Sequence, residues 1–168
     1  MKEREQLSIW FNGNQGAVSF CETLGYISQV WDDLIDNPSS VDSKSISKAF
    51  LLALTLADNR FYVENALILQ PVMKVAMIDW MTSNVISRDL PHVAYTIRDN
   101  LASVVITCIE IISGIEMAIL MAPDVRRFIH DEPLEDYING QPWWKQRKPG
   151  TGIRVSKGTC NAGAAVMG

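Results

Sequence analysis

Asp32, Asp33 and Asp36 lie close together and have the clearest capacity for chemistry in this sequence. On a helix, Asp32 and Asp36 share a face because they are four residues apart, and Asp33 lies beside them. Mg²⁺ prefers carboxylate oxygens and binds diphosphates through such pairs. The alternative interpretation is a solvated helix end before Asn37 and Pro38, where the helix dipole disfavours each acid by about a few tenths of a kcal/mol. The sequence favours the solvated end, with a nearby cation or basic side chain as its partner.

The Asp-Asp-x-x-Asp pattern of residues 32–36 resembles the first metal motif of class I isoprenoid and terpene synthases. The resemblance implies a second metal motif on a facing helix. In this sequence that motif falls on Asp99-Asn100-Leu101-Ala102-Ser103, with Thr107 at the position of the family's glutamate. It implies a Mg²⁺-dependent, diphosphate-binding enzyme in which Asp99, Ser103 and Thr107 form the second metal set. Arg98 would then contact the diphosphate.

Other polar residues offer no complete catalytic set. His92 and His130 lack the cysteine or carboxylate spacing of a zinc site, so we interpret them as surface or cap residues. Glu110 and Glu116 interrupt an apolar stretch and are six residues apart, so they do not share a helix face. They are interpreted as part of a narrow polar stripe. The alternative pairs Glu110 with a basic side chain of another helix or subunit.

Apolar residues that recur every three or four positions predict helices through most of residues 1–139. The first clear helix follows Asn12-Gly13-Asn14 and ends before Pro38. Asp42 or Ser40 is expected to cap a second helix, with Ile46, Phe50, Leu54 and Ala57 on one face. Asn59 is expected to cap a third, which kinks or restarts at Pro71 and continues through Trp80.

In the second half of this region the pattern predicts one long, apolar helix. Asp89 is expected to cap it, with Pro91 in its first turn, and apolar residues recur from Val93 to Ile119 before Pro123 ends it. Short helices are expected over residues 125–130 and 134–139, the second closed by Gly140. The fold class predicted for residues 1–140 is therefore all-α, a bundle of four to five main helices.

The last 28 residues differ from the rest of the chain in charge and composition. The 168 residues carry a net charge of −4, but residues 141–168 hold five cations and no acid. Residues 1–140 therefore carry −9. The segment also contains five of the ten glycines and two prolines, so it is not expected to pack a core of its own. We therefore expect two parts: a helical bundle over 1–140 and an extended basic Gly/Pro-containing C-terminal arm over 141–168.

The arm combines tryptophans with cations, the residue types that most often dominate protein interfaces. We expect it to bind neighbouring subunits, either other copies of the chain or other assembly proteins. Nucleic acid is not the favoured partner, because a body with a charge of −9 would repel a phosphate backbone. The residues expected to bind a partner are Trp143, Trp144, Lys145, Arg147, Lys148, Arg154 and Lys157.

A small acidic helical body followed by a Gly-rich arm resembles, in layout, the head-completion or adaptor proteins of tailed bacteriophages. The resemblance implies a non-enzymatic structural protein of a virion, an adaptor, tail or internal protein, that docks through its arm and needs no cofactor. The charged N-terminus lacks the apolar core of a signal peptide, and no apolar run of 18 residues is free of charge. We therefore expect the host cytoplasm or the virion as location, with no membrane partner. Cys21 and Cys108 are expected to be small core residues.

Overall fold

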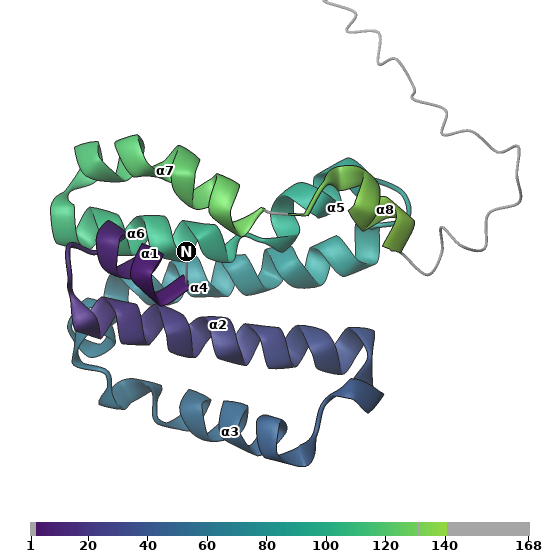
Figure 1. Ribbon diagram of the computed structural model, residues 1–168, viewed down its shortest axis with the longest axis horizontal. Helices are drawn as coiled ribbons and strands as arrows, with labels where there is room; N and C mark the ends of the chain where they lie inside the picture. The colour runs from purple at the N-terminus through teal and green to yellow at the C-terminus, as the bar shows by residue number, and fades with distance from the viewer. Residues whose placement is uncertain (1–2, 131, 141–168) are drawn as a thin grey trace, which may run out of the picture.

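The computed structural model describes residues 3–130 and 132–140, and this part of the chain is all-α, without strands (Figure 1). The predicted fold class is confirmed, and five of its helices have twelve or more residues. The arm, residues 141–168, lies outside the described residues. The helices are α1 (Glu3–Trp10), α2 (Gln15–Asp36), α3 (Ser43–Leu54), α4 (Arg60–Ile86), α5 (Pro91–Arg98), α6 (Leu101–Ser113), α7 (Ile115–Ile129) and α8 (Leu134–Gly140), with 3₁₀ turns at Pro38–Ser40 and Leu56–Asp58.

Side-chain caps fix the starts of α2, α3 and α4. The Asn14 side chain accepts a hydrogen bond from the Ala17 amide at 3.1 Å and begins α2. Asp42, one of the two caps predicted for α3, accepts from the Ser45 amide at 2.6 Å, which lowers the pKa of its carboxyl. Each oxygen satisfies a backbone N–H that has no partner within its helix. The Asp42 carboxylate also interacts favourably with the partial positive charge at the start of the helix.

Helix α4 is continuous, although the sequence predicted a kink or restart at Pro71. Asn59 caps it as predicted, accepting from the Tyr62 amide at 2.9 Å. The Asn59 side chain also donates to the Gly16 carbonyl at 3.0 Å, which ties the start of α4 to the start of α2. Pro71 removes one backbone hydrogen bond. Leu69 and Ala76, on either side of Pro71, are both buried in the core.

The single long helix predicted from Val93 to Ile119 is wrong: the segment forms α5, α6 and α7 in succession. The first break lies at Asp99 and Asn100. The second lies at Gly114, whose φ of +85° and ψ of 167° no L side chain adopts without strain. The apolar period continues across both breaks and therefore concealed them.

Two predicted helix boundaries in the same region are also wrong. Pro123 lies inside α7, so the separate short helix expected over residues 125–130 is the second half of α7. Asp89 does not cap α5, because Leu90 occupies the N-cap position without a side-chain hydrogen bond. Pro91 does occupy the first turn, as predicted. The last helix, α8, ends at Gly140, close to the predicted boundary.

The core lies where α1, α2, α4, α6 and α7 meet. Phe11, Phe20, Leu69 and Ile109 are its largest fully buried side chains. Phe20 of α2 stacks on Tyr62 of α4 with ring centroids 5.5 Å apart. At roughly 25 cal/mol per Å² of buried apolar surface, side chains of this size each contribute about 1.5–3 kcal/mol. Cys21 and Cys108 are buried in this core, as predicted.

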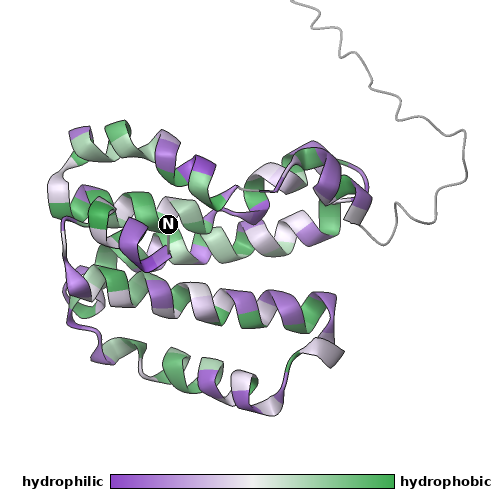
Figure 2. Cartoon of the chain, viewed as in Figure 1, coloured by the Kyte–Doolittle hydropathy of each residue, from purple (hydrophilic) through white to green (hydrophobic). Residues whose placement is uncertain are grey.

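The long helices form a stack, and its two outermost members are the least covered. Figure 1 shows α7, α6, α4, α2 and α3 in that order from top to bottom, and successive members of this series contact one another. Helix α1 packs on α2 at one side of the stack, and α5 and α8 pack together at one end. Helix α3 contacts α2 and buries only Ala49. Figure 2 shows that α3 nevertheless carries hydrophobic segments.

Candidate functional site

The acidic end of α2 faces α4 through Asp32. This carboxylate is partly buried and accepts a hydrogen bond from the Trp80 indole Nε1 at 3.0 Å. Asp33 accepts instead from Gln29 of its own helix at 3.0 Å. Asp36 is exposed at the last position of α2. The three aspartates therefore have different surroundings, and only Asp32 is held by a residue distant in sequence.

Two cavities adjoin at Asp32, Trp80 and Arg98, which line both. The larger, about 650 Å³, lies among α1, α2, α4, α6 and α7, and its polar residues include Glu22 and Asp99. The smaller has a volume of about 180 Å³. It is lined by Asp32, Asp36, Trp80, Ser83, Asn84, Arg98, Tyr137 and Gly140. Asp32 and Asp99 thus line the larger cavity, Asp32 and Asp36 line the smaller one, and Asp33 lines neither.

Arg98 connects the acidic end of α2 to α8. Its NH1 donates to Glu132 Oε2 at 2.9 Å, and its Nε lies 3.7 Å from Asp99 Oδ1. Its guanidinium carbon lies 4.9 Å from the centre of the Tyr137 ring, a cation–π contact. Arg98 also lines the smaller cavity with Asp32 and Asp36, so α5 places a basic side chain near the acidic end of α2, although the ion pairs of Arg98 are with Asp99 and Glu132.

Burial and charge shift the pKa values of two of these carboxyls in the same direction. Desolvation and the neighbouring Asp32 raise the pKa of Asp36 above its ordinary value, while Arg98 opposes the shift. Desolvation also raises the pKa of Asp99, against Arg98 and His130. His130 Nδ1 lies 2.9 Å from Asp99 Oδ2, although the atoms are not aligned for a hydrogen bond. Both carboxyls therefore hold a proton more readily than a solvated aspartate does.

Ser103 and Thr107 of the second predicted metal set belong to a hydrogen-bond network and line neither cavity. Ser103 donates to Asn100 and accepts from Arg126 at 2.9 Å, and Asn100 in turn donates to Asp79 of α4. Thr107 donates to the Ser103 carbonyl at 2.8 Å. Of the predicted set, only Asp99 lines a cavity with Asp32. This network links α4, α6 and α7, which is a structural role.

In the part of the chain that is described, no group of three or more His, Cys, Asp or Glu side chains is placed to hold a metal ion. Asp32 accepts one hydrogen bond from Trp80, and Asp99 Oδ1 lies 3.7 Å from Arg98 Nε, so each carboxylate already has one partner. Magnesium binding therefore stays a prediction. The seven residues expected to bind a partner, from Trp143 to Lys157, lie outside the described residues. His92 is exposed, and His130 ends α7, as interpreted from the sequence.

Glu110 and Glu116 are both exposed, but they belong to different helices because Gly114 separates α6 from α7. The single polar stripe predicted for them on one helix is therefore wrong. Sequence reasoning also missed Trp80 and Tyr137 as residues of the acidic site. No local pattern marks them, because their contacts with Asp32 and Arg98 span 48 and 39 positions.

A second feature is a large uncovered hydrophobic surface. The amphipathic face predicted for α3 is indeed formed, but it is not buried: Phe50 and Leu54 are each 66% exposed. The side of α4 that points away from the core is likewise apolar and exposed. We call this surface the outer apolar face. It comprises Trp31 and Ile35 of α2, Ile46, Phe50 and Leu54 of α3, and Leu67, Ile78, Met81 and Val85 of α4.

Comparison of this chain with known protein families, with curated proteins and with solved structures finds no match.

Proposed function

We propose that this protein is a non-enzymatic assembly protein whose helical body joins other subunits. The observation that carries the proposal is the amount of apolar surface left uncovered. Twenty-two large hydrophobic side chains in the described residues are exposed, at fractions between 37% and 94%. Soluble monomers rarely expose contiguous apolar patches larger than a few hundred Å². Covering such a surface with another subunit removes it from water.

The charge distribution supports a second contact through the arm. Residues 141–168 carry +5, and the acidic end of α2 lies beside Gly140, the last residue before the arm. The arm of one copy therefore has a surface of opposite charge available on the body of another. The resemblance in layout to bacteriophage adaptor proteins makes a virion the assembly that we propose, with the host cytoplasm as the place where the chain is made.

Light scattering on the purified full chain tests the proposal. We expect a mass above the 18.8 kDa of one chain, decreasing on dilution. A full-length variant with Trp143→Ser and Trp144→Ser measures the contribution of the arm, and we expect its assembly to dissociate at a higher concentration than that of the wild-type chain. A mass of one chain at every concentration, with no binding to other virion subunits, would contradict the proposal.

A second candidate function is Mg²⁺-dependent diphosphate binding. The observation that favours it is that Asp32, Asp36 and Arg98 line one cavity, which places two carboxylates beside a guanidinium. Calorimetric titration of the full chain with pyrophosphate, with and without Mg²⁺, tests this function. The function requires heat that depends on Mg²⁺ and disappears in the Asp32→Asn, Asp36→Asn variant. An identical isotherm for the variant and the wild-type chain would exclude these residues as the site.

A further inference from the structure

Helix α4 has a continuous apolar stripe on the side opposite its core contacts. Successive residues of an α-helix are 100° apart, so Leu67, Ile78, Met81 and Val85 fall within an arc of about 60°. Their exposed fractions lie between 54% and 94%. The buried residues of α4, such as Leu69 and Ala76, lie on the other side of the helix. An apolar stripe on a helix is normally covered by another element.

The spacing along this stripe is that of a helix that packs against another helix. Positions 67, 71, 74, 78, 81 and 85 alternate in steps of four and three, the a/d pattern of a coiled-coil seam. Four of the six positions hold Leu, Ile, Met and Val. Pro71 and Lys74 occupy the other two, and the long apolar stem of Lys74 can lie along its neighbours. The stripe therefore indicates a helix as the group that covers it.

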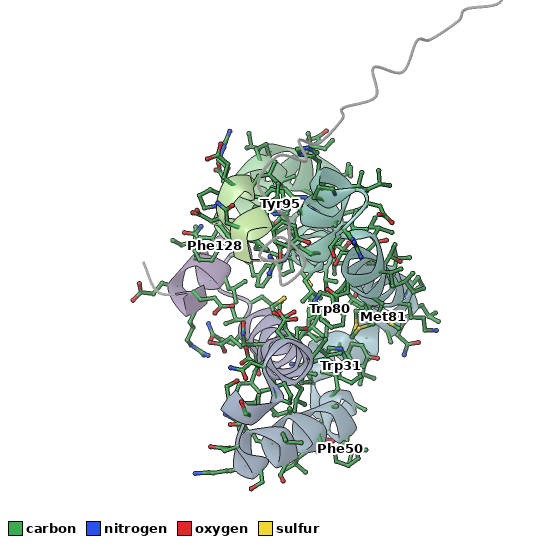
Figure 3. All side chains as sticks on the ribbon, turned by 90° about the vertical axis from the view of Figure 1, so that its right-hand side faces the viewer. Trp31, Phe50, Trp80, Met81, Tyr95 and Phe128 are labelled. Carbon is green, nitrogen blue, oxygen red and sulfur yellow. The ribbon has the colours of Figure 1, made fainter. Side chains whose placement is uncertain are left out.

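The stripe is flanked by further apolar side chains of α2 and α3. Figure 3 shows Phe50 of α3, Trp31 of α2 and Met81 of α4 along one side of the molecule. Trp31 contacts Trp80 of α4 with ring centroids 6.4 Å apart, which places the two helices' apolar side chains next to each other. Helix α1 lies at the opposite side of the stack, as Figures 1 and 3 both show. The outer apolar face is thus a surface formed by three helices.

We propose that a second copy of this chain covers the outer apolar face, in a symmetric dimer whose two α4 helices pack against each other. This inference rests on the proposed assembly function and specifies the surface and the partner. An interface made by the same patch on both subunits is the commonest arrangement of protein dimers. A second α4 supplies a helix with the same a/d spacing, so the apolar positions of each copy meet those of the other.

The size of the face fits this partner. Nine large side chains with roughly 100 Å² of exposed surface each present about 900 Å² per copy. A stable dimer interface buries about 800 Å² per partner, and homodimer interfaces are more apolar than the rest of the surface. The face contains no acidic residue, and Lys74 is the one cation within the α4 stripe. A contact between two such faces therefore brings no carboxylate into the interface, and Lys74 is the one charge that each α4 stripe adds.

The chain's own arm and a membrane fit this face less well. The arm is strongly basic, and its charge matches the acidic end of α2, not a face that holds no acid. Of the described helices, α4 is the one long and apolar enough to cross a membrane by length and composition. However, Phe61, Leu69 and Ala76 pack its inner side into the core, so lipid could surround α4 only if the core opened.

A charge placed in the stripe tests the proposal. Leu67→Glu with Val85→Glu puts four carboxylates into the dimer interface, while each replaced side chain is at least 79% exposed within one chain. Leu120→Glu on α7 is the matched control, because Leu120 is exposed to 64% and lies outside the face. The masses of the three full-length proteins are measured by light scattering, and circular dichroism checks that each is folded.

We expect twice the one-chain mass for the wild-type protein and for Leu120→Glu, and the one-chain mass for the double variant. If the wild-type chain assembles and the double variant assembles equally well, this inference fails while the assembly function stands. If the wild-type chain is a monomer, this inference fails, and the assembly function stands only if the monomer binds another virion subunit. A monomer that binds phosphatidylcholine vesicles through Leu67 and Val85 would assign the face to a membrane. If the wild-type chain is a monomer and the variant with Trp143→Ser and Trp144→Ser is a dimer, the arm is the segment that covers the outer apolar face.

Discussion

Helices α4 and α6 are both strongly apolar, yet only α6 is fully covered within one chain. α6 lies between α4 and α7 in the stack and buries Val104, Val105 and Ile109, and none of its large apolar side chains is exposed. α4 buries residues of similar size on its inner side and leaves eight large apolar side chains exposed. The comparison shows that an apolar helix indicates burial, but does not show whether its own chain or another chain provides the cover.

The largest expected difference between the two helices is in single-chain stability. Ile109→Ala in α6 removes a fully buried side chain, so we expect a loss of about 2–5 kcal/mol in the free energy of unfolding. Leu67→Ala in α4 removes a side chain that is 94% exposed, so we expect a loss below about 0.5 kcal/mol. Urea unfolding at a concentration where the protein is monomeric measures both. Equal losses would show that α4 is covered within one chain.

The cover over α6 depends on the sharp turn that brings α7 back along it. Gly114 forms this turn at a φ of +85°, and open space surrounds the position of an added Cβ. Gly114→Ala therefore strains only the backbone, and we expect it to cost about 1–3 kcal/mol. Thermal unfolding by circular dichroism measures the change, and Gly140→Ala at the end of α8 is the control. An unchanged melting temperature would contradict the turn geometry.

Lys74 offers a way to strengthen the proposed interface. It occupies an a/d position within the α4 stripe, where a dimer would bring two ammonium groups into an apolar contact. We expect Lys74→Leu to lower the dimer dissociation constant by roughly tenfold, about 1.4 kcal/mol. Sedimentation over a dilution series measures this constant. Lys48→Leu on α3, whose ammonium group lies 4.1 Å from the Tyr26 ring centre, serves as the control and should not tighten the dimer.

The smallest expected effect concerns the acidic end of α2. The pKa of Asp36 is raised in the folded chain, so this carboxyl adds stability at low pH and loses that contribution as the pH rises through the folded pKa. We therefore expect Asp36→Asn to stabilise the protein at pH 7 by about a few tenths of a kcal/mol, because the side chain is largely exposed. Below about pH 3, where the carboxyl is protonated, the two proteins should unfold alike. Destabilisation at pH 7 would show that the attraction to Arg98 dominates.

Local signals in the sequence predicted the helical class and several helix ends. Asp42 and Asn59 cap helices as expected, because a short polar side chain before an apolar period satisfies the free amides of the first turn. The helix α1 was not assigned. Gly114 was overlooked because the apolar period continues across it, and a sequence pattern does not report the backbone angle.

Contacts between segments that are distant in the sequence could not be predicted for the candidate sites. The sequence indicated a cation or a basic side chain near the acids of α2. It did not indicate Arg98, because the position of Arg98 depends on how α5 packs on α4. The apolar stripe of α3, with Phe50, was predicted as a helix face but not as an exposed one. Periodicity identifies the apolar side of a helix, and only the packed structure shows whether another helix of the chain reaches it.

Photo-cross-linking from α4 tests the central claim most directly. The full chain is prepared with benzoylphenylalanine in place of Leu67, mixed in equal amounts with ¹⁵N-labelled wild-type chain, irradiated and digested, and the linked peptides are identified by mass. We predict links between a labelled and an unlabelled chain that join residue 67 to peptides of α2, α3 or α4. The same group in place of Leu120 should give no such links. Links confined to one chain, or no links from residue 67, would contradict the account.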